Sequence, residues 1–117
     1  MRDNVPVTSA LDRMYQCPGE NEVLALLHSE MATLAPFHRH ALQAALIAPT
    51  RISVEDSPGE SVVAVASFDN VLLYWSDVEE GWEIAAPSEA GTIPTRGCSQ
   101  FELGHVMYQL YGEPHAV

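Results

Sequence analysis

The sequence predicts a single α+β domain over residues 1–117, in which helices come first, strands follow as a block and one helix ends the chain. Three changes of pattern predict it. Apolar residues first recur at helical spacing, β-branched runs separated by turn residues follow, and helical spacing then returns. Helices segregated from consecutive strands are typical of α+β folds. We therefore expect an N-terminal helical hairpin, a three- or four-stranded antiparallel meander, and a C-terminal helix packed on the sheet.

The N-terminal part is predicted to be helical. Residues 1–19 form a segment with a short helix, which ends at a Cys-Pro-Gly sequence that breaks helices. Residues 20–48 hold two helices separated at Ala35 and Pro36, because proline suits the first turn of a new helix. Pro49 ends the second helix. The first helix has an apolar stripe suited to a core, made of Val23, Leu27, Met31 and Leu34.

The antiparallel sheet is predicted over residues 51–86, from the runs RISVED, SVVAVASF, VLLYWS and WEIAAP. The run SVVAVASF is apolar on both faces, as expected of a central strand. Asp69 and Asn70 predict a two-residue hairpin turn. Wider turns are predicted over residues 57–59 and 77–81, which are rich in turn-forming residues.

A loop over residues 87–98 and a helix over residues 99–112 complete the chain. The length and composition of the loop make it a candidate functional segment. Ser99 and Glu102 match a capping box, which predicts that the helix begins at residue 99. Gly112 is a common stop signal, and the apolar residues between predict a face packed on the sheet.

The charge of the chain excludes several classes of function. It has no lysine, five arginines and sixteen Asp and Glu residues, which give a formal net charge of -11 and a pI near 4.5. Such a chain repels phosphate backbones and anionic membrane surfaces. We therefore expect no nucleic-acid and no membrane partner, and the charge favours a basic protein as the partner of a monomer or homodimer.

The densest acidic segment surrounds the predicted 77–81 turn, beside Trp75. Alternate turns of a meander lie at the same end of the sheet, so this turn and the 57–59 turn are expected to form one acidic rim. Carboxylates there would steer and pair with a basic partner, and a tryptophan would anchor it. The alternative is a solvated hairpin closed by a cross-strand tryptophan pair. The candidate partner-binding residues are Glu55, Asp56, Glu60, Asp77, Glu79, Glu80, Trp82 and Glu83.

No recognisable catalytic or metal-binding pattern accompanies these acids. His38 and His40 lie two residues apart, so on a helix their side chains diverge and do not share a metal ion. Cys98 is expected at a helix N-terminus, where thiols are activated, but His105 lies two turns further along. Phosphate-binding glycine loops, GxSxG, HExxH and paired CxxC motifs are missing from the sequence. We expect no catalytic residue, no metal site and no cofactor.

The N-terminal residues lack the long apolar stretch of a signal peptide, which favours a cytoplasmic protein with reduced thiols at Cys17 and Cys98. In size, acidity and α+β order, the chain resembles small bacterial immunity proteins as a class. That resemblance implies a non-enzymatic inhibitor of a basic toxin or effector. Three alternatives stay open: an acidic secretion chaperone or adaptor, an anti-restriction or anti-CRISPR protein that imitates DNA, and a small enzyme of unassigned type.

Overall fold

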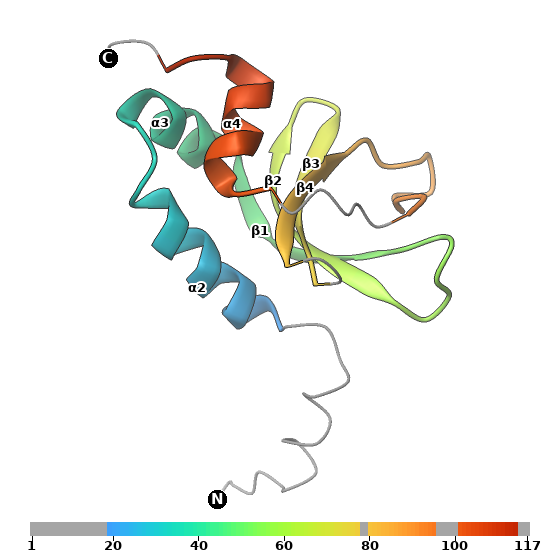
Figure 1. Cartoon of the computed structure of the whole chain (residues 1–117). Coiled ribbons are helices and arrows are strands. Elements are labelled where there is room, and N and C mark those ends of the chain that lie inside the picture. Colours follow the sequence, from blue (N-terminus) through green and yellow to red (C-terminus); the bar gives the residue numbers. More distant parts are fainter. Residues whose placement is uncertain (1–18, 78–79, 96–100, 115–117) are drawn as a thin grey trace, which may run out of the picture.

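In the part of the chain that the structure describes, three helices cover one face of a four-stranded antiparallel sheet, which confirms the predicted α+β architecture (Figure 1). The computed structural model describes residues 19–77, 80–95 and 101–114. The sheet order is β1-β2-β3-β4, a plain meander. The elements are α2 (Glu20–Met31), α3 (Pro36–Ala45), β1 (Leu46–Ser53), β2 (Ser61–Phe68), β3 (Val71–Ser76), β4 (Gly81–Ala85) and α4 (Leu103–Tyr111). The short helix predicted within residues 1–19 lies outside the described residues.

The main core lies between the helices and the sheet. Strand alternation turns Val63, Leu73 and Trp82 toward the helices, where all three are buried. The predicted stripe meets them, with Val23, Leu27 and Met31 of α2 buried and Leu34 buried just beyond the end of the helix, and the apolar face of α4 is buried there too. The residues that the helices and the α2–α3 turn contribute to this core are Val23, Leu27, Met31, Leu34, Leu42, Leu103, Val106 and Met107.

A second, smaller core covers the opposite face of the sheet. Val62, Ala64 and Tyr74 point to that side, so β2 is buried on both faces as its composition predicts. The segment after β4 folds over them and inserts Ile93, which is completely buried. The Ile93 backbone donates to Ser53 O at 3.1 Å and accepts from Glu55 N at 2.8 Å. Part of the predicted 87–98 loop is therefore a structural cover for the sheet.

The second predicted helix is shorter than expected. It ends at Ala45, and residues 46–48 belong to β1 rather than to a helix, with Leu46 already extended at φ -62 and ψ 141. Leu46 is extended because it pairs with Ala66 of β2, and Pro49 further disfavours helical geometry in Ala48, the residue before it. Proline is tolerated in β1 because this strand lies at the sheet edge, and the pairing with β2 is irregular between Leu46 and Thr50.

The last helix begins later than the capping pattern predicts. Its N-cap is Glu102 rather than Ser99, and the helix runs from Leu103. Phe101 is held extended because Trp82 N donates to Phe101 O at 2.9 Å in an antiparallel bridge at the edge of β4. Residues 99 and 100 lie outside the described part of the chain. His105, three residues after this N-cap, completes a capping box, since its Nδ1 accepts from Glu102 N at 3.2 Å.

The hairpin turns on either side of β3 both contain an acidic residue in the left-handed region. Asp69 has φ 56 in the predicted two-residue turn, which Phe68 and Val71 close as a pair. Glu80 has φ 54 in the turn between β3 and β4. Aspartate and asparagine tolerate this conformation better than glutamate does, so the backbone at Glu80 is the more strained of the two.

None of the helices described here has the length and apolar character needed to cross a membrane.

Candidate functional site

Two adjoining grooves lie between α2, the β3–β4 turn and the start of α4. The larger has a volume of about 600 Å3 and the smaller about 480 Å3. They share two lining residues, Trp75 and Glu80, so they form one depression, which we call the acidic trough. The larger groove is lined by Glu30, Thr33, Leu34, Ala35, His38, Trp75, Glu80, Phe101, Glu102, Leu103 and Gly104, and the smaller by Glu22, Leu26, Trp75, Asp77 and Glu80.

One wall of the acidic trough is a face of α2. Glu22, Leu26 and Glu30 recur every four residues, so they stand above one another on the helix. Each precedes a residue of the buried stripe, and the burial of that stripe fixes this neighbouring face at the edge of the core. The packing of α2 on the sheet therefore determines which of its acids line the trough.

The floor of the acidic trough contains Trp75, which is half-buried. It lies directly opposite Trp82 in the β3–β4 register, and the two rings meet edge to face, with centroids 5.1 Å apart and planes at 72°. Trp82 is completely buried. The cross-strand tryptophan pair expected from the sequence is thus present, and only Trp75 of the two faces the trough.

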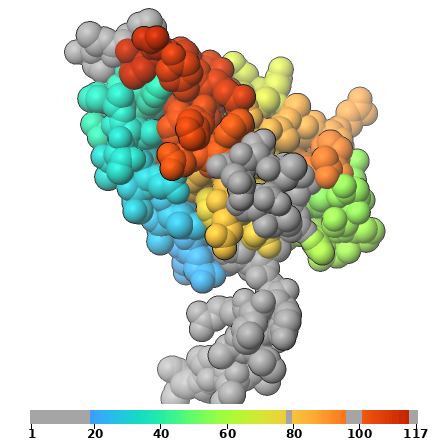
Figure 2. Space-filling view, in the orientation of Figure 1, coloured from blue at the N-terminus to red at the C-terminus, as the bar shows by residue number. Residues whose placement is uncertain are grey.

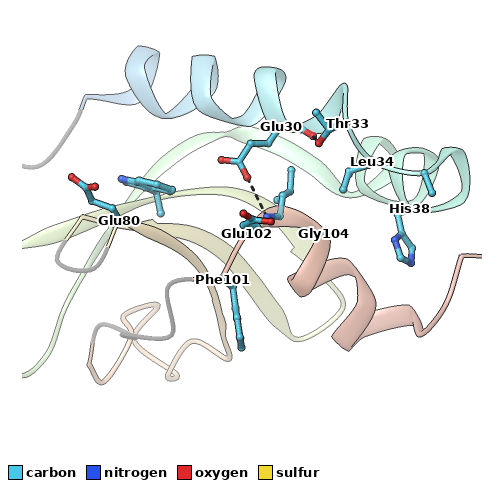
Figure 3. Close-up of a pocket in the computed structure, with 11 residues that line it drawn as sticks. Glu30, Thr33, Leu34, His38, Glu80, Phe101, Glu102 and Gly104 are labelled. Atoms are coloured by element: carbon cyan, nitrogen blue, oxygen red, sulfur yellow. Dashed lines mark hydrogen bonds between the residues drawn. The ribbon is translucent and has the colours of Figure 1, made fainter.

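Glu30 joins the walls of the acidic trough. Its Oε2 accepts from Trp82 Nε1 at 3.1 Å, and its Oε1 accepts from Leu103 N at 3.2 Å. Leu103 is the first residue of α4, whose free amides and dipole favour a carboxylate. One side chain therefore ties α2 to both β4 and α4. Figure 3 shows Glu30 and Glu102 in the middle of the larger groove, with Glu80 at one end and His38 at the other.

His38 lines the same larger groove as Glu30 and Glu102. A histidine beside carboxylates is a combination used in general acid–base catalysis. The His38 ring is only 4% exposed, and its Nε2 donates to Gly112 O at 2.8 Å. In Figure 3 this ring points away from Glu30, toward the end of α4. The hydrogen bond makes His38 a structural link between α3 and α4, with its ring turned away from the carboxylates.

Negative charge dominates the acidic trough. Within the described residues, neither groove is lined by an arginine: Arg51 instead contacts Glu20 at 3.7 Å, and Arg39 Nη1 donates to Leu34 O at 3.4 Å. In the part of the chain that the structure describes, no three His, Cys, Asp or Glu side chains are grouped so as to hold a metal ion. The trough carboxylates are spread along its walls, which suits an extended cationic surface better than a single ion.

The two turns of the acidic rim expected from the sequence contact different parts of the fold. Both turns lie at the same end of the meander, as predicted, but they have different neighbours. Glu55 and Asp56 at the β1–β2 tip donate backbone hydrogen bonds to residues 93 and 94, and Thr92 Oγ1 donates to the Glu55 carboxylate. Asp77 and Glu80 instead line the trough beside α2. In Figure 2 the green β1–β2 tip lies at the right and the blue start of α2 at the lower left.

The remaining predicted partner-binding residues fall in different environments. Trp82 is 0% exposed and Glu83 is 6% exposed, so neither is available on the surface of this structure. Glu83 pairs across the sheet with Tyr74, on the face away from the helices. Glu60 is exposed at the β1–β2 tip. Glu79 and Cys98 lie outside the described residues.

The helical half of the acidic trough is not evident from the sequence alone. Glu22, Leu26 and Glu30 carry a signal, because they repeat every four residues beside the core stripe. The sequence does not say which flank of α2 faces the β3–β4 turn, so it did not connect them with Glu80. Glu102 was interpreted only as part of a helix cap.

No family model, no curated protein and no solved structure matches this chain. The fold and the acidic trough therefore carry the functional argument by themselves.

Proposed function

We propose that this protein is a non-enzymatic binding protein that neutralises a basic protein partner, in the manner of a bacterial immunity protein acting in the cytoplasm. One observation carries the proposal: the acidic trough is lined by Trp75 together with Glu22, Glu30, Asp77, Glu80 and Glu102. A half-buried aromatic ring among carboxylates is the chemistry that anchors and steers a cationic protein surface.

The overall charge supports the same function. A net charge of -11 attracts a basic protein over a distance limited by ionic screening, which is about 8 Å at physiological salt. Proteins that act on nucleic acids are basic because they must bind phosphate. An acidic inhibitor of such a protein would associate quickly and would cover the surface that the nucleic acid uses.

Capture of the partner tests this proposal. The full chain is immobilised, exposed to lysate of its source organism at low salt, and washed at increasing salt before mass spectrometry. We expect one basic protein at near-stoichiometric amount, released by salt, whose toxic or enzymatic activity falls when the purified chain is added. Capture of no basic protein, or of one whose activity is unchanged by the chain, would refute the proposal. An immobilised variant with Trp75→Leu and Glu80→Asn identifies proteins retained by charge alone.

A further inference from the structure

We infer that the acidic trough recognises an extended, arginine-bearing segment of the partner, with one guanidinium group lying against Trp75 beside Glu80. This inference rests on the proposed function and specifies its partner chemistry. Three features carry it: the length of the trough, the aromatic surface on its floor, and the position of Glu80 between the two grooves.

The length of the acidic trough fits a strand-like segment. Its α2 wall extends from Glu22 to Glu30, eight residue steps that rise about 12 Å along the helix axis. An extended peptide advances roughly 3.3 Å per residue, so about four residues span that wall. The combined grooves continue past Glu30 to Leu34, which leaves room for a side chain at that end.

Trp75 supplies a fixed surface for a flat cation. Its edge-to-face contact with the buried Trp82 holds the indole in place, while the exposed part of the ring lines both grooves. Cations are attracted to the face of an indole ring, and guanidinium groups also stack on it. A ring that is already held loses little conformational freedom when the ligand arrives.

Glu80 lies where a guanidinium stacked on Trp75 needs a carboxylate. It lines both grooves together with Trp75, and Asp77 lines the smaller groove beside them. Guanidinium presents two parallel N–H groups that match a carboxylate, whereas ammonium is a point charge that stacks poorly. The site is therefore expected to prefer arginine to lysine, which a general excess of negative charge would not do.

A synthetic pentapeptide that alternates glycine and arginine, with blocked ends, probes the site directly. It is titrated into the isotopically labelled full chain while the Trp75 Nε1–H and Leu26 methyl signals are followed by NMR. Two control peptides replace arginine by lysine or by citrulline, which keeps the shape but removes the charge. We expect the arginine peptide to shift both signals and to bind about two- to fivefold more tightly than the lysine peptide. The citrulline peptide should leave both signals in place.

The chain offers a matched pair of variants. Asp69 and Glu80 are both acidic, both have a left-handed φ, and lie at opposite ends of β3. Asparagine suits that conformation, so Asp69→Asn and Glu80→Asn each remove one charge without straining the backbone. Glu80→Asn should weaken the arginine peptide at least threefold and abolish its preference over lysine, whereas Asp69→Asn should leave both unchanged. Trp75→Phe, which keeps an apolar ring, should weaken it about twofold.

Equal binding of the arginine and lysine peptides, or equal effects of the two asparagine variants, would overturn this inference. Its failure is distinguishable from failure of the proposed function. If a basic partner is captured but binds the Glu80→Asn variant normally, the trough is not the site and the neutralising function stands. If the arginine peptide binds as expected and no basic protein is captured, the trough chemistry stands and the neutralising function fails.

Discussion

The indole Nε1 of Trp82 donates a hydrogen bond of 3.1 Å to the carboxylate of Glu30, which lies 52 residues earlier in the chain. This contact joins the completely buried Trp82, near the start of β4, to the wall of the acidic trough. The other carboxylate oxygen of Glu30 holds the first amide of α4. The shape of the trough is therefore coupled to the stability of the fold.

Replacement of Glu30 is expected to destabilise the protein. Glu30→Ala leaves the buried Trp82 N–H without its acceptor, at a cost of about 1–3 kcal/mol in the free energy of unfolding. Glu30→Gln keeps an oxygen for Trp82 but turns an amide N–H toward Leu103 N, so its effect should be smaller. Urea denaturation measures both, with Glu89→Ala at an exposed position as the control, expected within about 0.5 kcal/mol of the parent. A Glu30→Ala protein as stable as that control would show that the contact contributes nothing.

Loss of the His38 side chain is expected to loosen the end of α4. His38→Ala removes the donor to Gly112 O and opens a space in a buried position, which should cost about 1–3 kcal/mol. His38→Gln retains an N–H of similar reach and should recover part of the loss. Thermal unfolding gives the order of stability, and hydrogen exchange at Gly112, whose amide donates to Tyr108 O, reports the local effect. Equal stability of the alanine and glutamine variants would argue against the hydrogen bond.

The two tryptophans are expected to respond differently to substitution. Trp82→Ala should cost about 3–5 kcal/mol, enough to unfold a marginally stable domain, because this ring is completely buried. Trp75→Phe should cost less than about 1.5 kcal/mol, since Trp75 is half-buried and the change keeps an aromatic ring. Guanidinium unfolding monitored by circular dichroism compares them. A larger loss of stability from the Trp75 variant than from the Trp82 variant would contradict the placement of Trp75 on the trough floor and Trp82 in the core.

The phenol of Tyr108 is expected to ionise at a higher pH than that of an ordinary tyrosine. Repulsion from the Glu113 carboxylate raises the pKa of Tyr108 above its ordinary value of 10.0, and its hydroxyl also donates to Glu113 Oε2 at 3.3 Å. Because the folded-state pKa is raised, this pair supports folding below the unfolded pKa and loses that support as pH rises through the folded one. Ultraviolet titration of the phenol should show Tyr108 ionising above pH 10.0, and Glu113→Gln should lower its midpoint. An unchanged midpoint in that variant would remove Glu113 as the cause.

Local patterns in the sequence predicted most of the fold. The runs over residues 61–68 and 71–76 became β2 and β3 with the predicted limits, because β-branched composition and turn residues act locally. The start of α4 and the end of α3 were misplaced for non-local reasons. Phe101 is extended because it pairs with Trp82, and Leu46 because β1 pairs with β2.

The candidate site was only half predictable for the same reason. Asp77 and Glu80 belong to a turn that the sequence predicts, and their negative charge made that turn a candidate binding site. Their partners across the acidic trough, Glu22 and Glu30, come from a helix more than 40 residues away, and only the packing of α2 brings them opposite. The burial of Trp82 likewise depends on how α2 and α4 cover β4.

The rate at which the captured basic partner associates with the chain tests the central claim most directly. Stopped-flow measurements compare the parent with Glu80→Asn and Asp69→Asn over a range of salt concentrations. If the acidic trough is the binding site, Glu80→Asn slows association about two- to threefold at low salt and makes it less salt-dependent, while Asp69→Asn matches the parent. Identical rates for the two variants would contradict the claim that the trough receives the partner.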